Sequence, residues 1–173
     1  MKVLLYRKDE KVFAKSGVGR AMKHQVEALK LAGIDYTFSE KDNFDIVHLN
    51  TISPSSYLMA KRARRKGKKV VYHGHSTEED FRNSFLFSNL LAPFFKIWLK
   101  ICYKTGDIIL TPTPYSKQLL EGYDLNRPII DVSNGIDLQL FARDEAKIDD
   151  FRKFFNLSAD DRVIVSVGHY FER

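Results

Sequence analysis

The sequence predicts an α/β protein built on a doubly wound, parallel, Rossmann-like sheet. Short runs rich in Val and Ile recur along the 173 residues with helical patterns between them, and this alternation is typical of parallel βαβ units. The runs do not alternate strictly between apolar and polar residues, as expected for strands covered on both faces. We expect strands at residues 3–6, 34–38, 46–49, 70–72, 108–110, 129–132 and 163–167.

Helices are expected between these strands. Apolar residues recur at helical spacing over residues 21–31, and Gly33 follows as a C′ residue. A second helix, over residues 55–66, ends in the same way at Gly67. Further helices are expected at residues 86–103, 114–121 and 144–155.

The length of the chain and an Asn-Gly break in its sequence indicate one main domain and the start of another. A chain of 173 residues has room for one domain with a proper core but not for two full-size α/β domains. The Asn-Gly pair at residues 134–135 marks a break, and a final strand without a following helix has nowhere to bury its faces. We therefore expect residues 1–142 to form the amino-terminal domain, and residues 143–173 to hold a linker helix and the first strand of a truncated second domain.

Composition excludes several classes of protein. Hydrophobic residues at 44% and charged residues at 29% argue against a disordered chain, a collagen-like repeat or a disulfide scaffold. The single cysteine, Cys102, has no internal partner, which suggests a reducing compartment and favours a buried thiol over a reactive one. The short apolar run after Met1 is followed at once by charges, unlike a signal peptide. A cytoplasmic location is expected.

Positive charge points to an anionic partner. The net charge of +6 favours nucleic acid, an anionic membrane or a phosphorylated substrate, without choosing among them. No acidic residue interrupts one short basic cluster, whose members are Lys61, Arg62, Arg64, Arg65, Lys66, Lys68 and Lys69. This cluster is a candidate binding surface, and a solvated helix end is the simpler alternative.

The first candidate site is a glycine turn that opens a helix. Ligands of open α/β sheets bind beyond the carboxyl ends of the strands, and the loop after the first strand leads into Gly17-Val18-Gly19. Glycines let the backbone approach a ligand, and the free amides of a helix start favour an anion such as phosphate. A turn without a ligand is equally frequent. A dinucleotide site is a weaker alternative, because Met22 stands where its third glycine belongs, although Glu40 resembles a ribose-binding acid.

The second candidate site holds two histidines. His73 and His75 flank Gly74 directly after the strand at residues 70–72, so both imidazoles are expected at the mouth of the crevice. Each can donate or accept a hydrogen bond near neutral pH. A zinc site is poorly supported, because no Cys or Asp cluster supplies further ligands at metal spacing. Structural histidines are the alternative.

Together these segments resemble glycosyltransferase family 4, whose retaining enzymes have the GT-B arrangement of two facing Rossmann-like domains. The matching features are Ser16-Gly17-Val18-Gly19 at a helix start, Ile46-Val47-His48 before a Ser/Pro loop, His75, and Asn134-Gly135-Ile136-Asp137 followed by Phe141. The resemblance covers the whole chain. It implies the amino-terminal half of a two-domain enzyme whose carboxyl-terminal domain binds most of the donor.

The same resemblance implies roles for residues. Gly17, Val18 and Gly19 would bind the donor diphosphate through the backbone, and His75 would be the catalytic residue that contacts the transferred sugar or steers the acceptor. Candidates for acceptor or sugar binding are Arg20, Asn50, His73, Ser76 and Glu79. The nucleotide sugar, a UDP-sugar, is a substrate, and neither a metal nor another cofactor is expected. The leaving phosphate would take the acceptor proton, so no carboxylate nucleophile is needed.

Residues 73–82 are similar to a narrower group of bacterial enzymes that glycosylate diacylglycerol or glycosyl-diacylglycerol. The implied function is transfer of a hexose to a membrane glycerolipid by an enzyme whose isolated amino-terminal fragment is inactive. One alternative is a family 4 enzyme that builds a cell-surface polysaccharide or another glycan. A second is a non-enzymatic nucleic-acid-binding domain, which no recognised motif supports, so we expect no nucleic-acid partner.

A membrane surface is the expected site of action. Residues 86–103 combine a bulky apolar face with lysines at four-residue steps, which fits a helix lying in the interface better than a spanning one. Packing against the sheet is the alternative. We expect peripheral association with the inner face of the cell membrane through Lys61, Arg62, Arg64, Arg65, Lys66, Lys96, Trp98 and Lys100.

Overall fold

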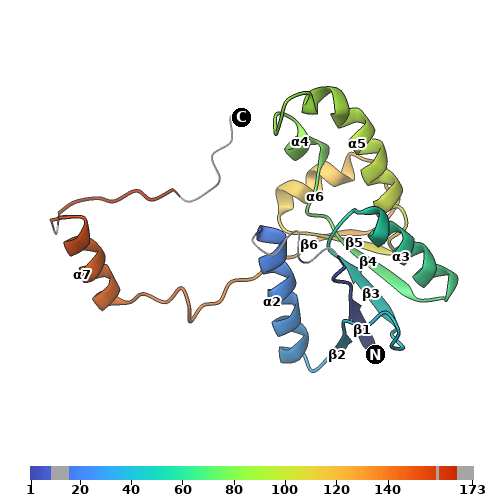
Figure 1. The fold of residues 1–173 in the computed structure, drawn as a ribbon, viewed down its shortest axis with the longest axis horizontal. Helices are drawn as coiled ribbons and strands as arrows, with labels where there is room; N and C mark the ends of the chain where they lie inside the picture. The colour runs from blue at the N-terminus through green and yellow to red at the C-terminus, as the bar shows by residue number, and fades with distance from the viewer. Residues whose placement is uncertain (9–15, 159, 167–173) are drawn as a thin grey trace. The chain divides into compact units, whose positions relative to one another are not determined.

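The computed structural model describes residues 1–8, 16–158 and 160–166. Its main unit is a six-stranded parallel sheet in the order β2-β1-β3-β4-β5-β6, with helices on both faces (Figure 1). The strands are β1 (Lys2–Leu5), β2 (Asp35–Thr37), β3 (Ile46–Leu49), β4 (Lys69–His73), β5 (Ile108–Thr111) and β6 (Ile129–Asp131). The predicted doubly wound, Rossmann-like fold is confirmed.

A short polar side chain caps the start of each described helix except α5 (Ser88–Tyr103). The others are α2 (Gly17–Leu31), α3 (Pro54–Arg65), α4 (Glu78–Phe81), α6 (Pro114–Glu121) and α7 (Glu145–Phe154). In these five helices a Ser, Thr or Asp side chain accepts a hydrogen bond from the third backbone amide of the helix. Gly33 and Gly67 follow α2 and α3 with φ of 63° and 69°, as predicted for C′ residues.

The core is split between the two faces of the sheet. The larger cluster lies under α3, α5 and α6 and includes Val70, Tyr72 and Leu120. The smaller one packs Val3 of the sheet against Val26 of α2. Cys102 is fully buried in the larger cluster, and burial raises the pKa of its thiol to about 12, which confirms a structural cysteine. Because strand residues alternate between the faces, the side chains of His48 and His73 project on the α2 side.

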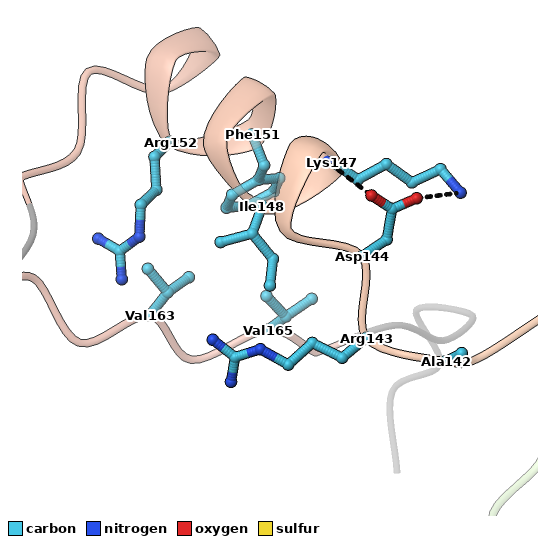
Figure 2. Close-up of a pocket in the computed structure, with 9 residues that line it drawn as sticks. All are labelled: Ala142, Arg143, Asp144, Lys147, Ile148, Phe151, Arg152, Val163 and Val165. Atoms are coloured by element: carbon cyan, nitrogen blue, oxygen red, sulfur yellow. Dashed lines mark hydrogen bonds and ion pairs between the residues drawn. The ribbon is translucent and has the colours of Figure 1, made fainter.

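A second unit begins at Ile136. In it, Ile148 and Phe151 of α7 face Val163 and Val165 across a shallow pocket, while Lys147 pairs with Asp144 (Figure 2). The predicted strand at residues 163–167 is wrong over residues 163–166, which form no strand, and residue 167 lies outside the described residues. A strand needs a neighbour to satisfy its backbone, and the described part of the second unit offers none. The predicted boundary after residue 142 stays a prediction.

Candidate functional site

One pocket lies where the carboxyl ends of β3 and β4 meet the start of α2. Its lining residues are Val18, Asn50, Thr51, Ile52, Ser53, His75 and Ser76. Asn50 follows β3 directly and His75 follows β4, so the ends of two parallel strands bring them to the same edge. The first turn of α2 and the second imidazole therefore share one pocket, at the place where open α/β sheets bind ligands.

A pair of amide side chains, from buried Asn50 and half-buried Gln25, orients His75. Gln25 Nε2 donates to Asn50 Oδ1 at 2.7 Å, and Asn50 Nδ2 donates back to Gln25 Oε1 at 2.8 Å. Asn50 Oδ1 also lies 3.2 Å from His75 Nε2. An amide oxygen only accepts, so the proton of a neutral His75 ring is on Nε2 and its Nδ1 carries a lone pair. That nitrogen can accept a hydrogen bond from a hydroxyl.

Three imidazoles stack behind the pocket. The ring of His75 lies 4.2 Å from the ring of His73, with 8° between their planes, and His73 lies 5.7 Å from His48. Gln25 Nε2 is 3.0 Å from His73 Nδ1, so the same amide contacts both Asn50 and the middle ring. His73 is buried and lines a separate pocket under α2 with His48, not the pocket of His75. His73 therefore packs against the ring of His75 and does not line its pocket.

Burial keeps these rings neutral. It lowers the pKa of His75 to about 4. The pKa of His48 is lowered to about 4 by burial and, to a smaller extent, by His75, and burial lowers the pKa of His73 further. A neutral imidazole at pH 7 can orient a hydroxyl or accept its hydrogen bond. It does not supply positive charge to a diphosphate.

The start of α2 offers space and backbone amides instead. Ser16 caps the helix, with its side-chain oxygen 3.4 Å from the amide nitrogen of Gly19. A side-chain carbon built on Gly17 would meet no atom of the described residues within 4 Å, so these residues leave space in front of Gly17. First-turn amides have no partner within a helix and lie at the positive end of its dipole. These features suit an anion. Residues 9–15 of the preceding loop lie outside the described residues.

Gly74 is required for the close approach of two strands. Its amide donates to Leu110 O at 2.6 Å, which ties the end of β4 to β5. A side-chain carbon on Gly74 would lie 2.8 Å from Leu120 Cδ1 and 3.4 Å from Leu110 O. Only glycine fits there without a shift, so the path of the chain between His73 and His75 is fixed by packing.

The other predicted contact residues have mixed positions. Ser76 lines the pocket, and its carbonyl accepts a hydrogen bond of 2.9 Å from Tyr103 OH. Arg20 is exposed on α2, and its side chain is not among those that line the pocket. Glu79 accepts a hydrogen bond of 2.8 Å from Tyr123 OH. Of these three, only Ser76 is placed beside His75.

Lys96 and Trp98, two of the predicted membrane contacts, each interact with other parts of the protein. Lys96 Nζ pairs with Glu78 at 2.9 Å and lies 4.5 Å from the centre of the Tyr123 ring. Trp98 Nε1 donates to Ile52 O at 2.8 Å. These interactions direct both side chains against the protein, because a helix that covers a sheet buries one face. Lys100, further along α5, is partly buried.

The basic cluster on α3 is exposed as predicted. Arg64 pairs with Asp107 at 3.3 Å. No ion pair is found between the other members and the described residues. Of these members Lys68 is partly buried, and the exposed ones are Lys61, Arg62, Arg65, Lys66 and Lys69.

Two further properties of the described residues bear on the kind of site. Within residues 1–8, 16–158 and 160–166, no group of three or more His, Cys, Asp or Glu side chains is arranged to hold a metal ion. Over the same residues, no helix has the length and apolar character needed to cross a bilayer.

Sequence reasoning missed two members of the site. Gln25 was not singled out, because a polar residue on an amphipathic helix gives no sign that it points inward. His48 was noted only within a motif, and its place in the stack depends on strand register: Leu5 of β1 pairs with His48, which in turn pairs with Val71 of β4. The available signal was that the strand holding His48 is expected next to the strand that ends in His73.

The Rossmann-like sheet and the pocket at its carboxyl edge are consistent with the amino-terminal half of a GT-B glycosyltransferase. The sequence profile described as Glycosyltransferase Family 4 matches residues 22–140, and the chain belongs to that family. Over 174 aligned positions the chain is 45% identical to the processive diacylglycerol alpha-glucosyltransferase of Acholeplasma laidlawii. The alignment covers 100% of this chain and 51% of that relative, so the chain spans about half the relative's length.

Proposed function

We propose that this chain is the amino-terminal part of a retaining hexosyltransferase that moves a hexose from a UDP-sugar to diacylglycerol or glycosyl-diacylglycerol. The observation that carries the proposal is the 45% identity, over the whole chain, to a relative named for glucosylating diacylglycerol. The pocket supports it, since an open helix start and a neutral imidazole converge there.

In this proposal the start of α2 binds the leaving diphosphate. Charge develops on that group as the sugar departs, and the backbone amides of Gly17 and Val18 stabilise it without a metal. The amide of Gly19, predicted as a third donor, is buried and already donates to Ser16 Oγ. His75 Nδ1 accepts a hydrogen bond from a hydroxyl of the sugar or of the acceptor, while Asn50 holds the ring in place. The leaving phosphate takes the acceptor proton.

A carboxyl-terminal domain completes the donor site. The second unit exposes large apolar side chains that an isolated helix would not need: Leu138 is 77% exposed, Leu140 70% and Phe154 79%. Large apolar side chains exposed to this extent are typical of surfaces that another part of a protein covers. Coverage by that domain fits a relative about twice as long as this chain.

The lipid acceptor determines where the enzyme acts. A glycerolipid with two acyl chains stays in its bilayer, so the enzyme works at the membrane, and we propose peripheral association with the inner face. The exposed cations of α3 are suited to anionic headgroups, each contributing about 1 kcal/mol close to the surface.

The test is an assay of the full-length protein. UDP-glucose and UDP-galactose are each offered with diacylglycerol, glucosyl-diacylglycerol and water-soluble sugars, and the anomeric configuration of the product is determined by NMR. We expect an α-linked glycolipid. Transfer only to water-soluble acceptors would overturn the lipid proposal and favour polysaccharide or glycan synthesis.

A further inference from the structure

The outward face of α5 is apolar. An outer ridge runs from the loop before α5 along the helix, and its members are Leu86, Phe87, Leu90, Phe94, Ile97 and Ile101. Leu86 is 78% exposed, Leu90 70% and Phe94 68%. The ridge lies on the side of α5 that does not pack on the sheet.

Core packing does not account for the outer ridge. The opposite stripe of α5 already fills the core, with Ala92, Leu99 and Cys102 fully buried. The helix is therefore apolar on both faces. A helix at a water-exposed surface normally carries polar residues opposite its buried stripe, and an exposed apolar patch of this kind marks an interaction site.

The backbone before α5 is also unusual. Phe87 is the N-cap of α5, has φ of 66°, and makes no capping hydrogen bond through its side chain. The left-handed region is unfavourable for a bulky side chain, and Gly or Asn would adopt it at less cost. Strain of this kind tends to be kept where it serves a function. Here it presents a phenyl ring, 69% exposed, at the tip of the ridge.

Exposed cations lie on α3, the helix next to α5. The rings of Tyr57 on α3 and Trp98 on α5 are 5.5 Å apart, so the two helices pack side by side over the same sheet face (Figure 1). Lys61 Nζ lies 5.7 Å from the centre of the Tyr57 ring. An apolar ridge flanked by exposed Lys and Arg is complementary to an anionic lipid surface, where acyl chains lie next to charged headgroups.

We infer that the outer ridge enters the boundary between headgroups and acyl chains of an anionic bilayer, with the cations of α3 at headgroup level. This inference rests on the proposed function, since a glycerolipid acceptor requires approach to the membrane. The inference assigns the membrane contacts of α5 to the side chains that face away from the sheet, in place of Lys96 and Trp98. An interfacial position also agrees with α5 being a helix of 16 residues, too short to cross a bilayer, that contains Pro93.

The test measures partition of the full-length protein onto vesicles. Vesicles of phosphatidylcholine, with or without phosphatidylglycerol, are sedimented with the protein. Leu90→Ser/Phe94→Ser removes two inserted side chains and should weaken partition on the order of 100-fold. Leu31→Ser is the matched control, because Leu31 is 90% exposed at the end of α2, outside the ridge, and it should bind as the parent does.

Charge is tested separately. Arg62→Gln/Arg65→Gln should weaken partition on the order of tenfold on vesicles that contain phosphatidylglycerol, and added salt should remove the difference. Circular dichroism melting shows whether each variant is folded. If Leu90→Ser/Phe94→Ser is unfolded, Ile97→Ser and Ile101→Ser, tested singly, replace it with an expected loss on the order of tenfold each.

The outcomes separate this inference from the proposed function. Lost vesicle partition with retained transfer to diacylglycerol in detergent micelles supports both. Lost partition in a protein that transfers only to soluble sugars supports the ridge and overturns the proposed acceptor. Unchanged partition of the folded ridge variants overturns the inference. So does a ridge-dependent dimer in analytical ultracentrifugation without vesicle binding, because a second copy would then cover the ridge.

Discussion

Replacing Gly74 by alanine tests whether packing fixes the chain between the two histidines. The new carbon would lie 2.8 Å from Leu120 Cδ1 and 3.5 Å from Ile109 Cγ2. Leu120 is fully buried, so its methyl group has little room to move away. Overpacking of this kind costs about 1–3 kcal/mol, and the smaller entropy of an unfolded chain with alanine returns about 0.4–1 kcal/mol. With an overpacking cost at the middle of its range, about 2 kcal/mol, the net loss of stability is about 1–1.6 kcal/mol.

Thermal denaturation of full-length Gly74→Ala, followed by circular dichroism, measures this loss. The melting temperature should fall by roughly 2–8 °C. Gly17→Ala is the matched control, because no atom of residues 1–8, 16–158 or 160–166 lies within 4 Å of its added carbon, and it should melt at or slightly above the parent temperature. An unchanged melting temperature for Gly74→Ala would refute the packing argument.

The remaining predictions concern the pocket and its surroundings. Gly17→Ala should lower transfer at least about tenfold in a steady-state assay, because the methyl group occupies space needed by the donor; parental turnover would contradict this. His75→Ala should strongly lower turnover while the melting temperature changes little. A loss of turnover that is matched by a loss of folding stability would mark His75 as structural. The free energy of unfolding should fall as the pH drops from 6.5 towards 4, by about 1.4 kcal/mol per pH unit for each buried imidazole. The reason is that the imidazoles bind protons in the unfolded state but not in the folded state. Urea denaturation at several pH values measures the slope. Lys96→Met should cost about 1–3 kcal/mol in thermal denaturation, since it leaves buried Glu78 without one partner, and should leave vesicle partition unchanged.

Much of the fold follows from local patterns. The strand at residues 46–49 was predicted with its final bounds, because a short apolar run between turn residues leaves little choice. Helix ends at Gly33 and Gly67 were predicted from the preference of glycine for positive φ. The segment at residues 163–166 was different: its Val and Ile residues have strand propensity, but a strand also requires a neighbour.

The site was partly accessible to sequence reasoning. The rule for parallel sheets brought the glycine turn and His75 to one edge, where Val18 and His75 now line the same pocket. The amide pair of Gln25 and Asn50 depends on how α2 packs on the sheet, which no local pattern encodes. The orientation of α5 was hidden for a different reason. Because the helix is apolar on both faces, its hydrophobicity alone did not reveal which face packs inward.

A crystal structure of the full-length protein with UDP-glucose tests most directly whether α2 and His75 serve one transfer site. We predict that the diphosphate lies within hydrogen-bond distance of the Gly17 amide and that a sugar hydroxyl contacts His75 Nδ1. A donor bound with its diphosphate away from α2, or with His75 facing no part of the sugar or acceptor, would contradict that prediction.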